Sequence, residues 1–399
     1  MQIDMIYLFK NGFWLSTGQV VATICSFFLA VVFARFVPKD IYGTYRFILS
    51  LTTIIAAFSL GGIGGVVVRA IAQNADGTLA EGFRLTMKWG IISLFVGIGI
   101  ALYYFIQGNQ VFGLALIIAG ISMPMSQAFS LYNSFFSGRK EFKTMTHYGI
   151  ISTIGVTIAM VIAIILHSNI IGLIATYFFT NLFFDILFYI QAAKHVRNDI
   201  VDMGTLTYGK HLSLMNIFSV IGDQFDNIVI FHSLGPIPLS IYSYAVAPPD
   251  QVIAIFKNIL SLILPRFSQS SIEDIKKGFM RKMALSGTVL GICTIGYIVL
   301  APYFYHIFFP AYISSIGLSR FYALIIFLTV TGLQSPVFDS VLAVRTRYAF
   351  TIGTNILRII LMLILVNFYG IWGIVLANII TKSLLTVIGT FVVMHGKLT

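Results

Sequence analysis

The stretch HYGIISTIGVTIAMVIAIILHSNIIGLIATYFFTNLFFDILFYIQ, residues 147–191, decides the fold class because it contains one charged residue, Asp185. A helix needs about 20 mostly apolar residues to cross the hydrocarbon core of a bilayer, so this stretch is long enough for two helices. His167-Ser168-Asn169 near its middle supplies polar turn residues, as Gly108-Asn109 and Tyr369-Gly370 do at two other short connections between predicted helices. The stretch therefore predicts two membrane-spanning helices joined by a tight hairpin.

The whole chain has a membrane composition. Of its 399 residues, 58% are apolar and 10% are charged, and the mean hydropathy is +0.93. A soluble domain carries about 25% charged residues, so this composition excludes a soluble enzyme, a nucleic-acid-binding protein and a disordered scaffold. The two cysteines, Cys25 and Cys293, lie in separate apolar runs. Neither a disulfide framework nor a cysteine metal site is therefore expected.

The sequence predicts an all-α polytopic protein that crosses the membrane twelve times. Sixteen Lys and Arg residues fall in the even-numbered loops, against four in the odd-numbered loops and their flanks. Because cytoplasmic loops are rich in Lys and Arg, the even-numbered loops and both termini are predicted to be cytoplasmic, and the net charge of +11 needs no nucleic-acid partner. The twelve predicted spans are 13–34, 43–66, 88–107, 111–133, 147–167, 170–191, 211–232, 240–264, 284–305, 318–342, 348–369 and 371–394.

A weak internal repeat has an offset of about 200 residues. The sequence PKDIY at 38–42 follows the first span, and PLSIY at 238–242 follows the seventh. Other short matches share this offset, which is typical of transporters built from duplicated halves. We therefore expect two six-helix lobes, 1–191 and 211–399, joined by a cytoplasmic linker at 192–210.

Polar residues form stripes inside several predicted spans. In span seven, Asn216, Ser219, Asp223 and Asp226 are separated by three, four and three residues, which places them on one helical face. A charge at mid-bilayer costs about 2.5–3.5 kcal/mol on insertion scales, so this face is expected to line a water-filled cavity. Other polar stripes lie in spans one, two and eight: Ser16, Gln19, Thr23 and Ser26; Tyr42, Arg46, Ser50 and Thr53; Asp250, Lys257 and Ser261.

The sequence leaves the roles of these charges open. Asp223 and Asp226 should titrate as a coupled pair, and one of them could carry a coupling proton or Na⁺. Lys257 either contacts a substrate or pairs with Asp250, seven residues earlier on the same face. For Arg358 and Lys382 we favour ion pairs with Asp339 or Asp185, and the alternative is that they extend a cationic cavity.

Other local patterns predict breaks and close packing rather than chemistry. Pro248-Pro249 should break or kink span eight and free backbone carbonyls. The glycine-rich run at 61–65 is expected to bring helices close together rather than to hold a phosphate. The chain has neither an HExxH motif nor a nucleotide phosphate loop, so no catalytic site, metal site or bound cofactor is expected.

Five stretches carry a resemblance to a known family: FVPKDIYGTYR at 36–46, LGGIGGVVVR at 60–69, GDQFDNIVI at 222–230, IYSYA at 241–245 and LPRFS at 264–268. They resemble the polysaccharide transporter, or O-antigen flippase (Wzx-type), family of the multidrug/oligosaccharidyl-lipid/polysaccharide (MOP) exporter superfamily. The resemblance implies a MATE-like fold of two six-helix lobes. It also implies a central cavity lined chiefly by spans one, two, seven and eight.

This family moves undecaprenyl-diphosphate-linked oligosaccharides across the bacterial cytoplasmic membrane by alternating access. The resemblance thus implies a flippase for surface polysaccharide biosynthesis, with membrane lipid, a polysaccharide polymerase and chain-length proteins as partners. The carboxylates Asp223, Asp226 and Asp250 offset the cations, so the net charge of the cavity stays open. The expected cavity residues are Gln19, Arg46, Asn216, Asp250, Lys257 and Arg358, with Asp223 and Asp226 as coupling candidates.

Three other functions compete with this one. The nearest is a cation- or proton-coupled multidrug exporter of the same superfamily, which would favour a carboxylate in span one, where this chain has none. A membrane polysaccharide polymerase is more distant, because it needs long outward-facing catalytic loops. A purely structural membrane protein would not need charges inside several spans.

Overall fold

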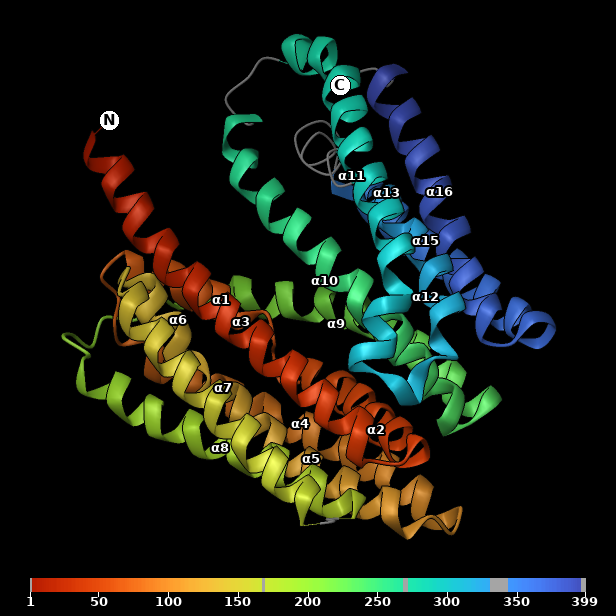
Figure 1. The fold of residues 1–399 in the computed structure, drawn as a ribbon. Coiled ribbons are helices and arrows are strands. Elements are labelled where there is room, and N and C mark those ends of the chain that lie inside the picture. Colours follow the sequence, from red (N-terminus) through yellow and green to blue (C-terminus); the bar gives the residue numbers. More distant parts are fainter. Residues whose placement is uncertain (1, 167–168, 268–271, 331–343, 396–399) are drawn as a thin grey trace. The chain divides into compact units, whose positions relative to one another are not determined.

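The computed structural model describes residues 2–166, 169–267, 272–330 and 344–395, which form helices joined by short turns (Figure 1). The chain divides into two compact units, Met1–Gln224 and Phe225–Thr399. This division falls inside one long helix, α9. The all-helical fold class predicted from the sequence is confirmed for the described residues.

The N-terminal unit contains eight helices and the first part of a ninth among its described residues. They are α1 (Gln2–Phe36), α2 (Lys39–Ala57), α3 (Ile63–Ala72), α4 (Thr78–Ile106), α5 (Gln110–Phe129), α6 (Leu131–Gly138), α7 (Phe142–Ile165), α8 (Ile170–Lys194) and α9 (Met203–Leu234). Helix α4 packs along α5, α1 along α7, and α5 along α8.

The C-terminal unit begins in α9. Its described elements then follow as α10 (Pro236–Phe267), α11 (Ile272–Phe308), the 3₁₀ turn η1 (Pro310–Tyr312), α12 (Ser315–Tyr322), α13 (Leu324–Leu328), α15 (Val344–Tyr369) and α16 (Ile371–His395). Buried apolar residues of α10, α11 and α13 pack together, among them Ile253, Leu290 and Ile326.

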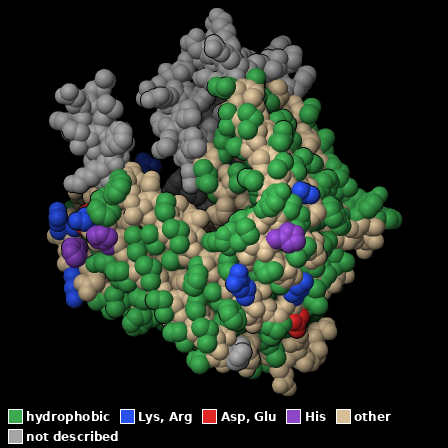
Figure 2. All heavy atoms as spheres, in the orientation of Figure 1, with side chains coloured by type: hydrophobic (Ala, Val, Ile, Leu, Met, Phe, Trp, Pro, Cys, Tyr) green, Lys and Arg blue, Asp and Glu red, His purple; other side chains and the backbone are tan. Residues whose placement is uncertain are grey.

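The outer surfaces of the helices are apolar, as expected for contact with lipid. Phe95, Ile106 and Ile292 are each at least 66% exposed, and hydrophobic side chains are spread over the described part of the face shown in Figure 2. So much exposed apolar surface is incompatible with water, and the chain is a multi-pass membrane protein. Eight described stretches are long and apolar enough to cross a bilayer: Gly12–Phe36, Thr78–Ile106, Gln110–Gly138, Phe142–Ile165, Ile170–Lys194, Met283–Phe308, Ile352–Tyr369 and Ile371–Thr390.

The other four predicted spans differ from these eight. The span at 43–66 is divided between α2 and α3 by a turn at Leu60, whose φ is 62°. The spans at 211–232 and 240–264 fall in α9 and α10, which carry the polar stripes. The span at 318–342 extends beyond residue 330, outside the described residues. The number twelve and the cytoplasmic termini therefore stay predictions.

Turn residues identified in the sequence join the helices as predicted. Gly108 and Gly370 adopt the left-handed backbone that favours glycine, with φ of 79° and 56°. Asn109 caps α5 by accepting the Phe112 N–H at 3.2 Å, and Asn169 caps α8 by accepting the Gly172 N–H at 2.8 Å. Residues 167 and 168 of the second turn lie outside the described residues.

Of the break or kink predicted at Pro248-Pro249, the break is wrong, because α10 is helical from Pro236 to Phe267, and the kink stays a prediction. A proline has the φ of a helical residue and removes only its own N–H donor, so neighbouring hydrogen bonds can keep a long helix intact. The packing role predicted for the glycine-rich run is confirmed at Gly62. A Cβ there would lie 3.0 Å from the Ser213 Oγ of α9, and the Gly62 N–H donates to that oxygen at 3.2 Å.

Candidate functional site

The C-terminal unit contains a cluster of charged and polar side chains, which we call the C-terminal cluster. At its more buried end, the Asp226 Oδ2 accepts hydrogen bonds from the Tyr242 hydroxyl at 2.7 Å and the Asn378 Nδ2 at 2.8 Å. The Asp226 Oδ1 lies 3.9 Å from the Arg358 Nη2. Helices α9, α10, α15 and α16 therefore each contribute one side chain to this end.

The other end of the C-terminal cluster is accessible. Asp250 of α10 is exposed and accepts a hydrogen bond from the Tyr322 hydroxyl at 3.0 Å. Lys257, also exposed, lies two helical turns further along α10. Lys382 of α16 and Lys257 both lie within electrostatic range of the Asp250 carboxylate. Asp226 and Arg358 are in turn within range of Lys382, which joins the two ends into one cluster.

The charge balance of this cluster is positive. It contains three cations, Lys257, Arg358 and Lys382, and two carboxylates, Asp226 and Asp250. A charge interacts over longer distances in a protein interior than in water, because the effective dielectric constant is lower. Arginine offers a planar fork of donors and lysine a compact point charge, and both suit phosphate oxygens. The cluster can therefore attract an anion at its accessible end.

The ion pairs differ from those predicted. Arg358 pairs with Asp226 rather than with Asp185, which belongs to the N-terminal unit and accepts a hydrogen bond from the Ser126 hydroxyl. Asp339, the other predicted partner, lies outside the described residues. Pairing with Asp339 therefore stays a prediction. The pair of Arg358 with Asp226 was not predicted, because sequence spacing identifies residues on one face of a helix but not which helices face each other. For Lys382, the alternative that it extends a cationic group agrees with its neighbours in the cluster.

The N-terminal unit contains the other predicted site residues. Arg46 of α2 lies within electrostatic range of Tyr177, and its buried Nε has no hydrogen-bond partner among the described residues. Gln19 of α1 is exposed, and its backbone carbonyl accepts a hydrogen bond from the Thr23 hydroxyl at 2.9 Å. Asn216 and Asp223 are exposed on α9.

The structure thus brings together four of the eight predicted residues: Asp226, Asp250, Lys257 and Arg358. That Gln19, Arg46, Asn216 and Asp223 line the same cavity stays a prediction. Sequence analysis did not assign Tyr242, Tyr322 and Asn378 to the site. Asn378 and Lys382 are four residues apart and share a face of the last predicted span. This spacing was the feature of the sequence that could have placed α16 at the site. Among the described residues, no group of three His, Cys, Asp or Glu side chains could hold a metal ion.

Comparison with known proteins supports the family and the fold. The family model for polysaccharide biosynthesis proteins matches residues 8–271. No curated protein sequence matches the chain. Solved structures with the same fold include an outward-facing multidrug resistance MATE family transporter of the MOP superfamily (TM-score 0.66, 14% identity, 96% of this chain and 95% of that chain).

Two further structures are similar over nearly the whole chain. One is the lipid II flippase MurJ in an inward closed conformation, with a TM-score of 0.67, 15% identity, and coverage of 95% of this chain and 87% of MurJ. The other is a MOP superfamily transporter from Pyrococcus furiosus whose binding pocket has reverse polarity. It has a TM-score of 0.60, 12% identity, and coverage of 96% of this chain and 95% of the transporter. The predicted MATE-like fold is therefore confirmed.

Proposed function

Since the chain belongs to the polysaccharide biosynthesis protein family, we propose that it is a membrane transporter that moves a lipid-linked oligosaccharide across the bacterial cytoplasmic membrane. The substrate would be an undecaprenyl-diphosphate-linked repeat unit for a surface polysaccharide of the O-antigen or capsule type. A polysaccharide polymerase and chain-length proteins would act on it after transport. The observation that carries this proposal is the positive balance of the C-terminal cluster.

The diphosphate of such a substrate is the part that is hardest to move through a membrane. It carries about two negative charges, and an isolated charge is strongly disfavoured in a low-dielectric medium. The exposed Lys257 would meet this anion first, with Lys382 and Arg358 behind it. Arg46 on α2 would meet it at a later stage of alternating access. Gln19 and Asn216 would add neutral hydrogen-bonding groups for the diphosphate or the sugars.

The coupling role of Asp226 is constrained by its partners. One oxygen already accepts two hydrogen bonds, and the other faces Arg358. The guanidinium would compete with a proton or Na⁺ for this carboxylate. Asp223 is exposed on the same helix, and we propose both carboxylates as candidates for coupling.

Transport into vesicles tests the proposal. The proteoliposomes would contain undecaprenyl diphosphate linked to a fluorescent oligosaccharide. The double variant with Lys257→Met and Lys382→Met should translocate this substrate about tenfold more slowly or worse, which corresponds to an increase of about 1.4 kcal/mol in the activation free energy. Replacement of both by Arg should retain most of the rate. Arg84→Met is the control, because Arg84 lies in an exposed ion pair with Glu81. A normal rate in the doubly neutralised variant would contradict the proposal.

A charge exchange then separates substrate binding from pairing. In the variant with Lys257→Asp and Asp250→Lys, the two charges exchange places on α10 and the net charge of the cluster is unchanged. If Lys257 contacts substrate, this variant should transport slowly. Normal transport would instead assign Lys257 to pairing with Asp250.

One observation favours a multidrug exporter as the second candidate function. Asp250 is an exposed carboxylate held by a tyrosine, and a carboxylate beside aromatic rings suits an organic cation. The same vesicles, tested with a fluorescent organic cation in place of the lipid-linked sugar, distinguish the two functions. Export that depends on Asp250 but not on Lys257 or Lys382 would favour the multidrug exporter.

A further inference from the structure

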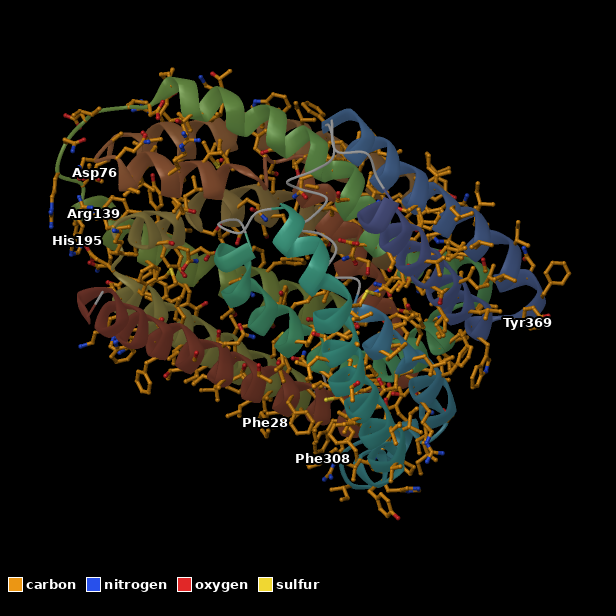
Figure 3. All side chains as sticks on the ribbon, turned by 90° about the horizontal axis from the view of Figure 1, so that it is seen from above. Phe28, Asp76, Arg139, His195, Phe308 and Tyr369 are labelled. Carbon is orange, nitrogen blue, oxygen red and sulfur yellow. The ribbon has the colours of Figure 1, made fainter. Side chains whose placement is uncertain are left out.

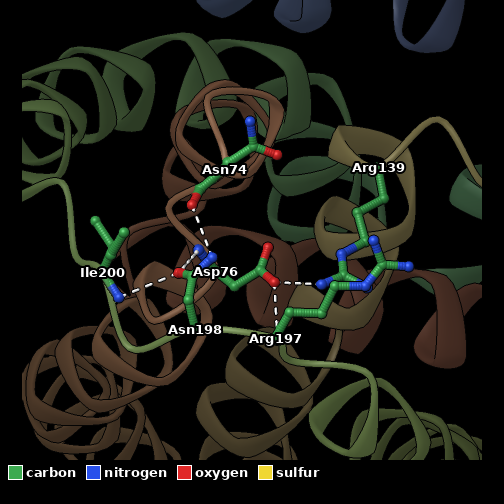
Figure 4. Close-up of polar contacts among 6 residues, drawn as sticks. All are labelled: Asn74, Asp76, Arg139, Arg197, Asn198 and Ile200. Carbon is green, nitrogen blue, oxygen red and sulfur yellow. Dashed lines mark hydrogen bonds and ion pairs between the residues drawn. The ribbon is translucent and has the colours of Figure 1, made fainter.

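The segment 195–202, which connects α8 to α9, is held against the N-terminal unit by a buried carboxylate. Asp76, between α3 and α4, is 3% exposed, and its Oδ2 accepts hydrogen bonds from the Arg139 guanidinium and from the Arg197 N–H, the latter at 2.9 Å (Figure 4). Arg139 also lies over the Phe135 ring, 4.6 Å from its centre. One carboxylate thus joins the start of the segment to the end of α6.

Asn198 fastens the middle of the segment. Its Oδ1 accepts the N–H of Asp76 and the N–H of Ile200, both at 3.1 Å, and its Nδ2 donates to the Asn74 carbonyl at 3.0 Å (Figure 4). The two backbones are so close that a Cβ on Gly77 would lie 2.6 Å from the Asp199 carbonyl. No side chain larger than that of glycine fits there without moving the segment.

The segment leads directly into a fixed start of α9. The Asp202 N–H donates to the Thr78 Oγ1 at 3.0 Å, and the Asp202 carboxylate caps α9 by accepting the Thr205 N–H at 2.9 Å. One turn later, Leu206 is 2% exposed in the core of the N-terminal unit. Ser213 bonds Gly62, as described above. The first three turns of α9 are therefore part of the N-terminal unit.

We propose that segment 195–202 is a fixed anchor rather than a flexible joint between the two lobes, and that Asp76 is a positioning residue for α9. The boundary between the compact units lies in α9, between Gln224 and Phe225, and not in this segment. By holding the start of α9, Asp76 sets the rotation of this helix about its axis and its position along that axis. The same helix carries Asn216 and Asp223. This role does not depend on which substrate the protein transports.

Distance measurements test whether Asp76 holds the segment. In a chain with Cys25→Ser and Cys293→Ser, spin labels would be placed at Gln73→Cys and Ile200→Cys, two exposed positions on the two sides of the contact. We expect one narrow distance in the parent chain and a broad distribution after Asp76→Ala. Asn198→Ala, which leaves the Asp76–Arg139 pair intact, should broaden it less. Arg84→Ala, which breaks an exposed ion pair in the first turns of α4, should leave it narrow.

Thiol labelling then tests whether the anchor positions α9. A water-soluble reagent should react with Asn216→Cys at a rate that Asp76→Ala changes several-fold. Ile154→Cys on the outer face of α7 should stay unreactive in both chains, because only general unfolding would expose it to the reagent.

Three outcomes would overturn the proposal. The first is a narrow distance after both Asp76→Ala and Asn198→Ala. The second is a broadened distance with unchanged labelling at Asn216→Cys, because the segment would then be loose without moving α9. The third is equal labelling increases at Asn216→Cys and Ile154→Cys, which would show simple unfolding. If Asp76→Ala does not fold, Asn198→Ala supplies both measurements.

Discussion

The two units bury an Asp–Arg pair in different surroundings. In the N-terminal unit, Asp76 and Arg139 lie at one end beside His195, while Phe28 of α1 lies far from them on the outer surface (Figure 3). Their side chains are 4% and 9% exposed, and Asp76 is also bound by a backbone N–H. In the C-terminal unit, Asp226 and Arg358 lie inside helices that are predicted to cross the membrane, with 14% and 18% exposure.

The difference lies in what surrounds each pair. Asp76 accepts hydrogen bonds from Arg139 and from the Arg197 N–H, and so joins three chain segments in the network of Figure 4. The Asp226 Oδ1 lies 3.9 Å from the Arg358 Nη2. These two residues belong to a larger cluster that has accessible members and one more cation than carboxylates. A buried pair bound by several chain segments holds structure together. A cation-rich cluster with accessible members can attract a passing anion, and this difference is the basis for proposing substrate contact in the C-terminal unit.

The largest effect should come from breaking the more buried pair, Asp76 and Arg139. Arg139→Ala leaves the Asp76 carboxylate buried without its cation, and we expect the free energy of unfolding to fall by about 3–5 kcal/mol. Thermal or denaturant unfolding of the purified protein measures this change. Arg84→Ala, at an exposed pair, should cost about 1 kcal/mol or less. Similar costs for the two substitutions would remove the distinction between a structural pair and a surface pair.

A smaller stability effect and a larger functional one should follow from changes in the C-terminal unit. Arg358→Met alone should lower the free energy of unfolding by about 1–3 kcal/mol, because Asp226 keeps two neutral donors. Adding Asp226→Asn removes the uncompensated charge and should restore most of this stability. Transport of the lipid-linked anion should stay slow in the double variant, since a cation is still missing. Recovery of both stability and transport would make this pair as purely structural as the first.

Sequence analysis predicted the features that depend on local pattern. The helical hairpins follow from apolar length, and the turns at Asn109 and Gly370 follow from residue type. The predictions of hairpins and turns succeed because each depends on residues close together in the chain. The polar face of α9 is also predicted from helical periodicity, and that it lines a cavity stays a prediction.

Features that depend on which helices meet could not be predicted in this way. Arg358 and Asp226 are 132 positions apart in the sequence, and no local pattern pairs α15 with α9. Tyr322 carries no spacing signal at all. The sequence of segment 195–202 is typical of a polar linker. Its contacts with Asp76 could not be predicted, because Asp76 lies in a loop more than a hundred residues earlier. A buried charge network between distant loops therefore needs the fold to be identified.

The smallest effect concerns the end of the anchor where Asp202 caps α9. Hydrogen bonds from the Thr205 hydroxyl, and then from the Thr205 N–H, hold the pKa of Asp202 below its usual range. Ionised Asp202 therefore stabilises the folded start of α9 at all pH values above about 3.9, the usual Asp pKa, and this stabilisation is lost as the pH falls through the lower folded pKa.

The distance between Gln73→Cys and Ile200→Cys should thus broaden slightly on acidification. Asp202→Asn keeps an oxygen that can cap the helix but does not titrate, so its distance distribution should change less between pH 6 and pH 3, a range of about one to two units around the Asp pKa. Other carboxylates titrate in the same range, and the difference between the two chains isolates the contribution of Asp202. If the chains broaden equally, the acid response does not come from Asp202, and its cap does not contribute to the anchor.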